Sequence, residues 1–137
     1  MIYAVIDTNV IVSSLLSQHL DAATVLIRKY ILNGKIVPLF NEEIYHEYEE
    51  VLHREKLHLP TDAVDAILDA ISFLGMMLER TKTEEIIIDQ KDVVFYEVAL
   101  SKEGSYLVTG NTKHFPKTPI VVTPAELLSI IEAEETH

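Results

Sequence analysis

The chain has no cysteine and no tryptophan, and its 11 lysine and arginine residues are outnumbered by 22 aspartate and glutamate residues. Without cysteine there is no disulfide, no thiolate nucleophile and no cysteine-ligated zinc or iron–sulfur centre. Any metal site must therefore use oxygen or imidazole ligands. The apolar N-terminal run holds Asp7 and Asn9, lacks a basic leader and is too short to span a bilayer, so we expect a cytoplasmic protein.

Positive charge is scarce as well. The formal net charge of −11 opposes simple electrostatic attraction to a nucleic acid, because phosphate binding normally uses a basic surface. The acids cluster in residues 42–55 and 132–135. We interpret these clusters first as solvated helix faces and second as a docking surface for a basic partner. A bound metal ion would offset part of the charge where a phosphate has to lie.

Length and patterning predict one α/β domain over residues 1–137. The chain is 48% hydrophobic, enough for one core, and no repeat or linker-like stretch divides it. Strands are predicted at 2–6, 36–40, 76–78, 106–109 and 120–122, and helices at 21–33, from 41 to near 53, from 61 to near 75, at 93–102 and at 124–132. This alternation predicts a mostly parallel central sheet with helices on both faces.

Polar side chains follow two of the predicted strands. Asp7 comes directly after strand 2–6, Asn111 follows strand 106–109, and Asp92 stands at the start of the helix that leads into that strand. Ligand sites of open α/β sheets lie beyond the carboxyl ends of the strands, so these three residues are the first candidates for a site. Capping of a helix would also explain Asp92 and, less well, Asp7.

Two glutamates have spacings that turn them inward. Glu47 lies three residues after Ile44 and four before Val51, on the apolar stripe of its helix. A buried carboxylate is expensive unless it is protonated, paired with a cation or bound to a metal. The alternative is an edge position from which the side chain reaches solvent. Glu97 has a similar inward spacing and is a second candidate.

Carboxylates from separate segments that meet in one cavity repel one another, and a divalent cation with oxygen ligands relieves that repulsion. Magnesium or manganese fits such a site best. The ion would polarise a phosphoryl oxygen and lower the pKa of a bound water. A phosphotransfer domain with Asp7 as nucleophile is less well supported, because there is no glycine-rich phosphate loop and position 9 is asparagine rather than a second aspartate.

The sequence resembles the PIN-domain family, in particular the VapC-like toxin ribonucleases of prokaryotic toxin–antitoxin pairs. The resemblance covers nearly the whole chain. It rests on Val5-Ile6-Asp7-Thr8-Asn9-Val10, on Glu47 within Glu43-Ile44-Tyr45-His46-Glu47-Tyr48, on Asp92 ahead of Ala99-Leu100, and on Leu107-Val108-Thr109-Gly110-Asn111 followed by Lys113-His114-Phe115.

The resemblance implies a metal-dependent ribonuclease that cleaves single-stranded RNA by hydrolysis. Asp7, Glu47 and Asp92 would hold magnesium or manganese and activate water. Asn111 stands at the fourth position, which many members fill with aspartate, so a second metal site would be weakened there although the amide still offers a carbonyl oxygen. The resemblance also implies a homodimer and a small basic antitoxin that places an arginine or lysine among the carboxylates.

Several neighbouring residues have two interpretations. Thr8, Asn9 and Thr109 would position the acids or the phosphate in the resemblance, but ordinary turn and cap roles explain them equally well. We interpret His114 as a surface residue rather than a general base. The lysines that could reach RNA phosphates are few and scattered in the sequence: Lys82, Lys91, Lys113 and Lys117. The spacing of Tyr45, Tyr48 and Tyr96 suits core or interface packing better than base stacking.

One hypothesis from a different class stays open. A catalytically silent PIN-like module that binds a protein or RNA would explain both Asn111 and the acidic charge. It differs from the nuclease in that metal would bind weakly or not at all, and substitution of Asp7 would leave function untouched.

Overall fold

Five short strands form one parallel sheet in a computed structural model that describes residues 1–136. They are β1 (Ile2–Ile6), β2 (Ile36–Phe40), β3 (Met76–Met77), β4 (Tyr106–Val108) and β5 (Val121–Val122), in the order β3-β2-β1-β4-β5. Every strand pair is parallel, which confirms the predicted α/β class. Central β1 is covered on both faces, and this explains its continuous apolar sequence.

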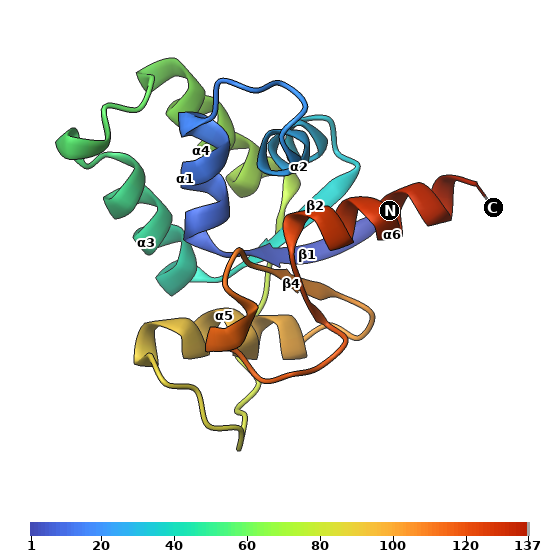
Figure 1. Cartoon of the computed structure of the whole chain (residues 1–137). Coiled ribbons are helices and arrows are strands. Elements are labelled where there is room, and N and C mark those ends of the chain that lie inside the picture. Colours follow the sequence, from blue (N-terminus) through green and yellow to red (C-terminus); the bar gives the residue numbers. More distant parts are fainter. Residues whose placement is uncertain (137) are drawn as a thin grey trace.

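The helices are α1 (Thr8–Leu16), α2 (Ala23–Leu32), α3 (Glu42–Leu52), α4 (Thr61–Leu74), α5 (Gln90–Leu100) and α6 (Pro124–Glu135), with short 3₁₀ turns η1 (Glu55–Leu57) and η2 (Thr112–His114). Figure 1 shows α1, α2 and α4 on one side of the sheet and α5 on the other, which confirms the expectation of helices on both faces. Helix α6 packs against α2, whereas α3 contacts both α4 and α5. The helix α3 therefore bridges the two layers. Among residues 1–136, no helix is both long enough and apolar enough to cross a bilayer.

One helix was missed, and the bounds of three others differ from the expected ones; α2 covers Ala23–Leu32 rather than 21–33. Strands β3, β4 and β5 are each one residue shorter than expected. Helix α1 was not predicted, because its buried side chains are as often polar as apolar: Thr8, Val10, Ile11 and Ser14. Helix α5 begins at Gln90 and ends at Leu100 rather than spanning 93–102, since Asp89 caps it. Helix α6 runs to Glu135, beyond the expected 132. The predicted capping box between Thr123 and Glu126 is present.

Candidate functional site

Asp7 lies where two neighbouring strands end. The register of β1 and β4 pairs Ile6 with Val108, so Asp7 comes to lie beside Thr109. The Thr109 hydroxyl donates a 2.7 Å hydrogen bond to Oδ2 of Asp7, whose side chain is only 8% exposed. Asp7 precedes α1, but no hydrogen bond of normal length and angle joins its side chain to the first backbone amides of that helix. Burial raises the pKa of Asp7. The Thr109 hydroxyl and the backbone amides of Asn9 and Thr8 oppose this rise.

Glu47 reaches the same region from α3. The Asn41 side chain caps this helix, and the buried Tyr48 hydroxyl donates to the carbonyl of Ile6 at the end of β1. That contact fixes α3 against the sheet one residue before Asp7 and holds the neighbouring Glu47 at the same edge. Glu47 is half-buried, which lies between the buried position and the solvent-exposed edge position that its spacing allowed. Its carboxylate accepts a hydrogen bond from the hydroxyl of Thr8.

Asp92 projects from the first turn of α5, and helix capping does not account for it. The cap is Asp89, whose carboxylate accepts a 2.9 Å hydrogen bond from a backbone amide of that turn. The pKa of Asp92 is raised to about 6, first by burial and then by the negative charges of Asp7, Asp89 and Glu47, with His114 opposing. Two of these charges come from Asp7, which follows β1, and from Glu47 on α3, so both side chains lie close enough to Asp92 to repel its carboxylate.

Asn111 and His114 complete the cluster. The backbone amide of Asn111 donates to the Thr109 hydroxyl at 3.0 Å, which links Asn111 to Asp7 through one residue. The Nδ2 atom of Asn111 lies 3.0 Å from Nε2 of His114, and Nδ1 of His114 lies 3.7 Å from Oδ2 of Asp92. His114 is exposed, as expected, but its position beside the acids was not foreseen. The one feature of the sequence that could have indicated this position is that His114 lies three residues after Asn111.

Glu97 is not part of this cluster, although its spacing resembled that of Glu47. Its carboxylate is 6% exposed and accepts hydrogen bonds of 2.8 Å from the guanidinium of Arg80 and from the backbone amide of Thr83. The Thr83 amide, ahead of Arg80, holds the pKa of Glu97 below its usual value against the effect of burial. Arg80 also contacts Glu43 on α3. Glu97 therefore anchors the segment before α5.

The donor chemistry of the acidic residues fits a hard divalent cation, because Asp7, Glu47 and Asp92 offer carboxylate oxygens and Asn111 adds an amide oxygen. Within residues 1–136, however, no three acidic or histidine side chains are arranged to hold one ion as they stand. Glu47 and Asp7 each accept a threonine hydroxyl instead. Like charges without a counterion move apart, so rotation of these side chains toward a common centre would accompany metal binding.

The raised pKa of Asp92, caused first by burial and then by neighbouring charges, predicts that Asp92→Asn stabilises the metal-free protein. With a pKa of about 6 in the folded chain against 3.8 as the ordinary value, ionised Asp92 disfavours folding. This cost to the free energy of folding is absent below the ordinary pKa and grows as the pH rises between the two pKa values. It reaches its full size above the pKa of the folded chain. We expect the variant to gain roughly 1–2 kcal/mol at neutral pH and almost nothing near pH 4. Urea unfolding of both proteins in chelator across this pH range measures the difference, and equal stability at neutral pH would contradict the raised pKa of Asp92.

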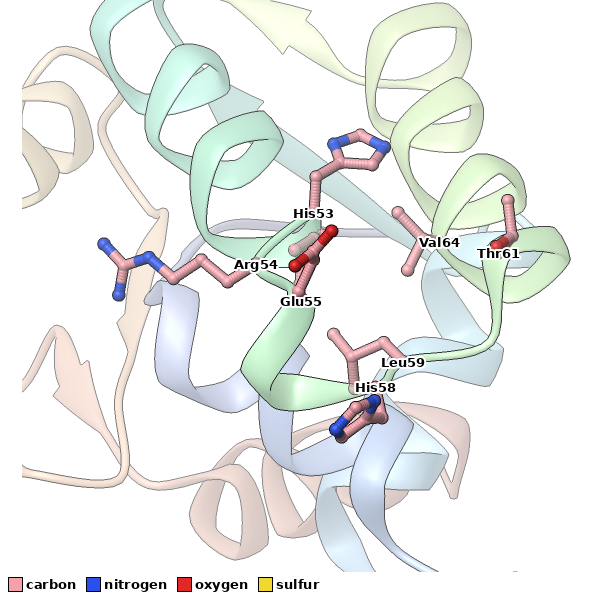
Figure 2. A pocket seen from close by; sticks show the side chains of 8 residues that line it. His53, Arg54, Glu55, His58, Leu59, Thr61 and Val64 are labelled. Carbon is pink, nitrogen blue, oxygen red and sulfur yellow. The ribbon is translucent and has the colours of Figure 1, made fainter.

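A separate hollow of about 430 Å³ lies between the end of α3 and the start of α4 (Figure 2). None of the four predicted site residues lines it. Figure 2 shows the imidazoles of His53 and His58 toward opposite ends of this hollow, so the two rings do not converge on a common ligand. The predicted chemistry therefore belongs to the carboxyl edge of the sheet and not to this hollow.

Comparison with known proteins gives one match. A family model described as PIN domain matches residues 3–113, a stretch that contains Asp7, Glu47, Asp92 and Asn111. Neither the curated proteins nor the solved structures gave a significant match.

Proposed function

This chain belongs to the PIN-domain family, whose members are in general metal-dependent nucleases, and we propose that it is an endoribonuclease that hydrolyses single-stranded RNA. The observation that carries the proposal is the convergence of Asp7, Glu47 and Asp92 at the carboxyl edge of the sheet. Burial raises the pKa of Asp92 to about 6, and the charges of Asp7 and Glu47 add to the rise. We assign these three carboxylates to a magnesium or manganese ion.

The bound ion would supply Lewis acidity toward a phosphoryl oxygen and a water of lowered pKa. The protein's own residues place the ligands. Thr109 orients the carboxylate of Asp7 through its 2.7 Å hydrogen bond and is itself held by the backbone amide of Asn111. Thr8 orients Glu47. Asn111 contributes an amide oxygen at the open side of the cluster, and a neutral residue there favours one tightly held ion over two.

The silent binding module is the second candidate, and Asn111 together with the net charge of −11 favours it. Burial of Asp7 favours the nuclease, because a module without metal gains nothing from a carboxylate that is 8% exposed and has no cationic partner within hydrogen-bonding distance among residues 1–136. The two candidates differ in one respect that can be measured, namely whether a divalent ion is needed for activity.

The cellular role proposed here is that of a cytoplasmic toxin in a toxin–antitoxin pair. The support is the resemblance to VapC-like proteins and the acidic surface, which suits a basic antitoxin that inserts a cation among the carboxylates. We further propose a homodimer. Expression of the wild type alone should arrest growth, and expression of an Asp7→Asn variant should not. Normal growth on expression of the wild type would remove the toxin assignment without touching the nuclease.

Metal removal tests the biochemical proposal. Protein treated with chelator should leave a single-stranded RNA intact, and added magnesium or manganese should restore cleavage, whereas the same sequence held in a duplex should be cut far more slowly. Denaturing gel electrophoresis of an end-labelled RNA measures both. If the metal-saturated protein binds the ion and leaves every RNA intact, the silent module replaces the nuclease.

A further inference from the structure

A second hollow, of about 490 Å³, opens beside the acidic cluster. The short turn η2 separates the two: His114 lies against Asn111 and Asp92, whereas Thr112 and Lys113 line the hollow. The chain thus passes directly from the cluster at Asn111 into the wall of the hollow at the next residue. A ligand that is long enough to leave the cluster along η2 enters this hollow.

Two of the lysines that are scattered in the sequence lie together in this hollow. Lys113 and Lys117 both line it and both are exposed. Neither forms an ion pair or a side-chain hydrogen bond with any residue of the described chain, 1–136. Lys35, Arg54 and Arg80, in contrast, each pair with a glutamate.

The one acidic residue in the wall is Glu126, and its carboxylate is already committed. Its Oε1 atom accepts a 2.9 Å hydrogen bond from the backbone amide of Thr123 in the capping box of α6. Two uncommitted lysines therefore face one bound carboxylate, a local excess of positive charge in a chain of net charge −11. The wall also contains Thr118, whose buried hydroxyl has no hydrogen-bond partner among residues 1–136.

We propose that this hollow binds a phosphate of the RNA strand next to the phosphodiester that is cleaved, with Lys113 and Lys117 neutralising it. The proposal rests on the proposed nuclease function and adds the means by which an acidic protein holds a polyanion. Lysine binds phosphate as a compact point charge that needs no fixed geometry, which suits an open, sequence-independent contact. The adjacent phosphodiester would then lie at Asp7, Glu47 and Asp92, the residues that would hold the ion.

The test compares Lys113→Gln/Lys117→Gln with a matched control, Lys29→Gln/Lys56→Gln, which removes the same charge from exposed positions on α2 and η1. In the first variant KM for a single-stranded RNA should rise about tenfold while kcat is unchanged, and the salt dependence of RNA binding should fall by roughly 0.7 in the log–log slope per lost phosphate contact. Manganese affinity should stay at the wild-type value. The control should match the wild type in all respects apart from a weak, general charge effect.

A modified substrate locates the contact. An RNA with a single uncharged methylphosphonate linkage, moved one position at a time away from the cleaved bond, should raise KM for the wild type at the contacted linkage. At that position the lysine variant should show no additional loss, because the charge pair is already absent. Additive losses at every position would overturn the proposal.

Failure of this proposal can be told from failure of the nuclease. If the lysine variant cleaves RNA with wild-type KM, the hollow has no role and the nuclease stands. If the wild type cleaves nothing, fluorescence anisotropy with a labelled single-stranded RNA decides. Binding that is weaker in the lysine variant but not in the control supports the hollow as a phosphate site. Equal binding by both double variants, or no binding by the wild type, overturns the proposal.

Discussion

Asp7→Asn should reduce RNA cleavage by roughly a thousandfold and remove high-affinity manganese binding. Asp7 is the most buried member of the carboxylate cluster and lies closest to the sheet, where Thr109 fixes its orientation. The amide preserves the volume of the side chain and its hydrogen bond but not its charge. Because the buried carboxylate is itself costly, the variant should fold at least as stably as the wild type in the absence of metal.

Cleavage should be measured at saturating metal beside Asp65→Asn, an aspartate-to-asparagine change at an exposed position of α4. The control should retain wild-type cleavage and metal affinity. An Asp7→Asn protein that still cleaves RNA within a few-fold of the wild type would show that the carboxylate does not serve the reaction. Thermal unfolding of both variants in chelator checks that any loss of activity comes from the site and not from the fold.

Gly75→Ala should cost at least about 3 kcal/mol of unfolding free energy and could leave too little folded protein to purify. A Cβ atom at Gly75 would lie 2.4 Å from the carbonyl oxygen of Ile71 and 2.6 Å from that of Pro38. Both are backbone atoms, one in α4 and one in β2, so neither can turn aside as a side chain would. The close approach lets α4 pass directly into β3 at the edge of the sheet.

Gly110→Ala is the matched control for stability. Nothing lies within 4 Å of the Cβ position at Gly110, and its backbone is not left-handed, so the added methyl group should change stability by only a few tenths of a kcal/mol. Urea unfolding of the three proteins in chelator measures the difference. A Gly75→Ala protein as stable as the control would show that α4 and β2 can separate at little cost.

The strands were predictable from sequence because a parallel sheet buries both faces of its central strands. Ile2–Ile6 and Ile36–Phe40 are short runs that are almost wholly apolar, and they were located to the residue. Helix α1 was not predicted because Thr8 and Ser14 face the interior and interrupt the periodic pattern of apolar residues. Helix α5 is buried on nearly every side from Val94 to Ala99, so its sequence has no amphipathic stripe to mark where it begins.

Part of the candidate site was also predictable from the sequence, and part depended on tertiary contacts. Residues that follow strands directly, such as Asp7, could be placed because parallel strands bring their carboxyl ends to one edge. Helical spacing ranked Glu97 only second to Glu47 and did not exclude it from the site, since both residues turn inward. Their difference lies in tertiary neighbours, Thr8 for the first and Arg80 for the second. His114 likewise reaches Asp92 only through the turn η2.

The location of a bound manganese ion tests the central proposal most directly. Crystals grown or soaked with manganese should give one strong anomalous peak at the carboxyl edge of the sheet, with oxygen atoms of Asp7, Glu47 and Asp92 about 2.0–2.4 Å from it. The side chain of Glu47 should have turned from Thr8 toward the ion. A peak elsewhere on the surface, or none at a concentration that supports RNA cleavage, would contradict the assignment of these three carboxylates.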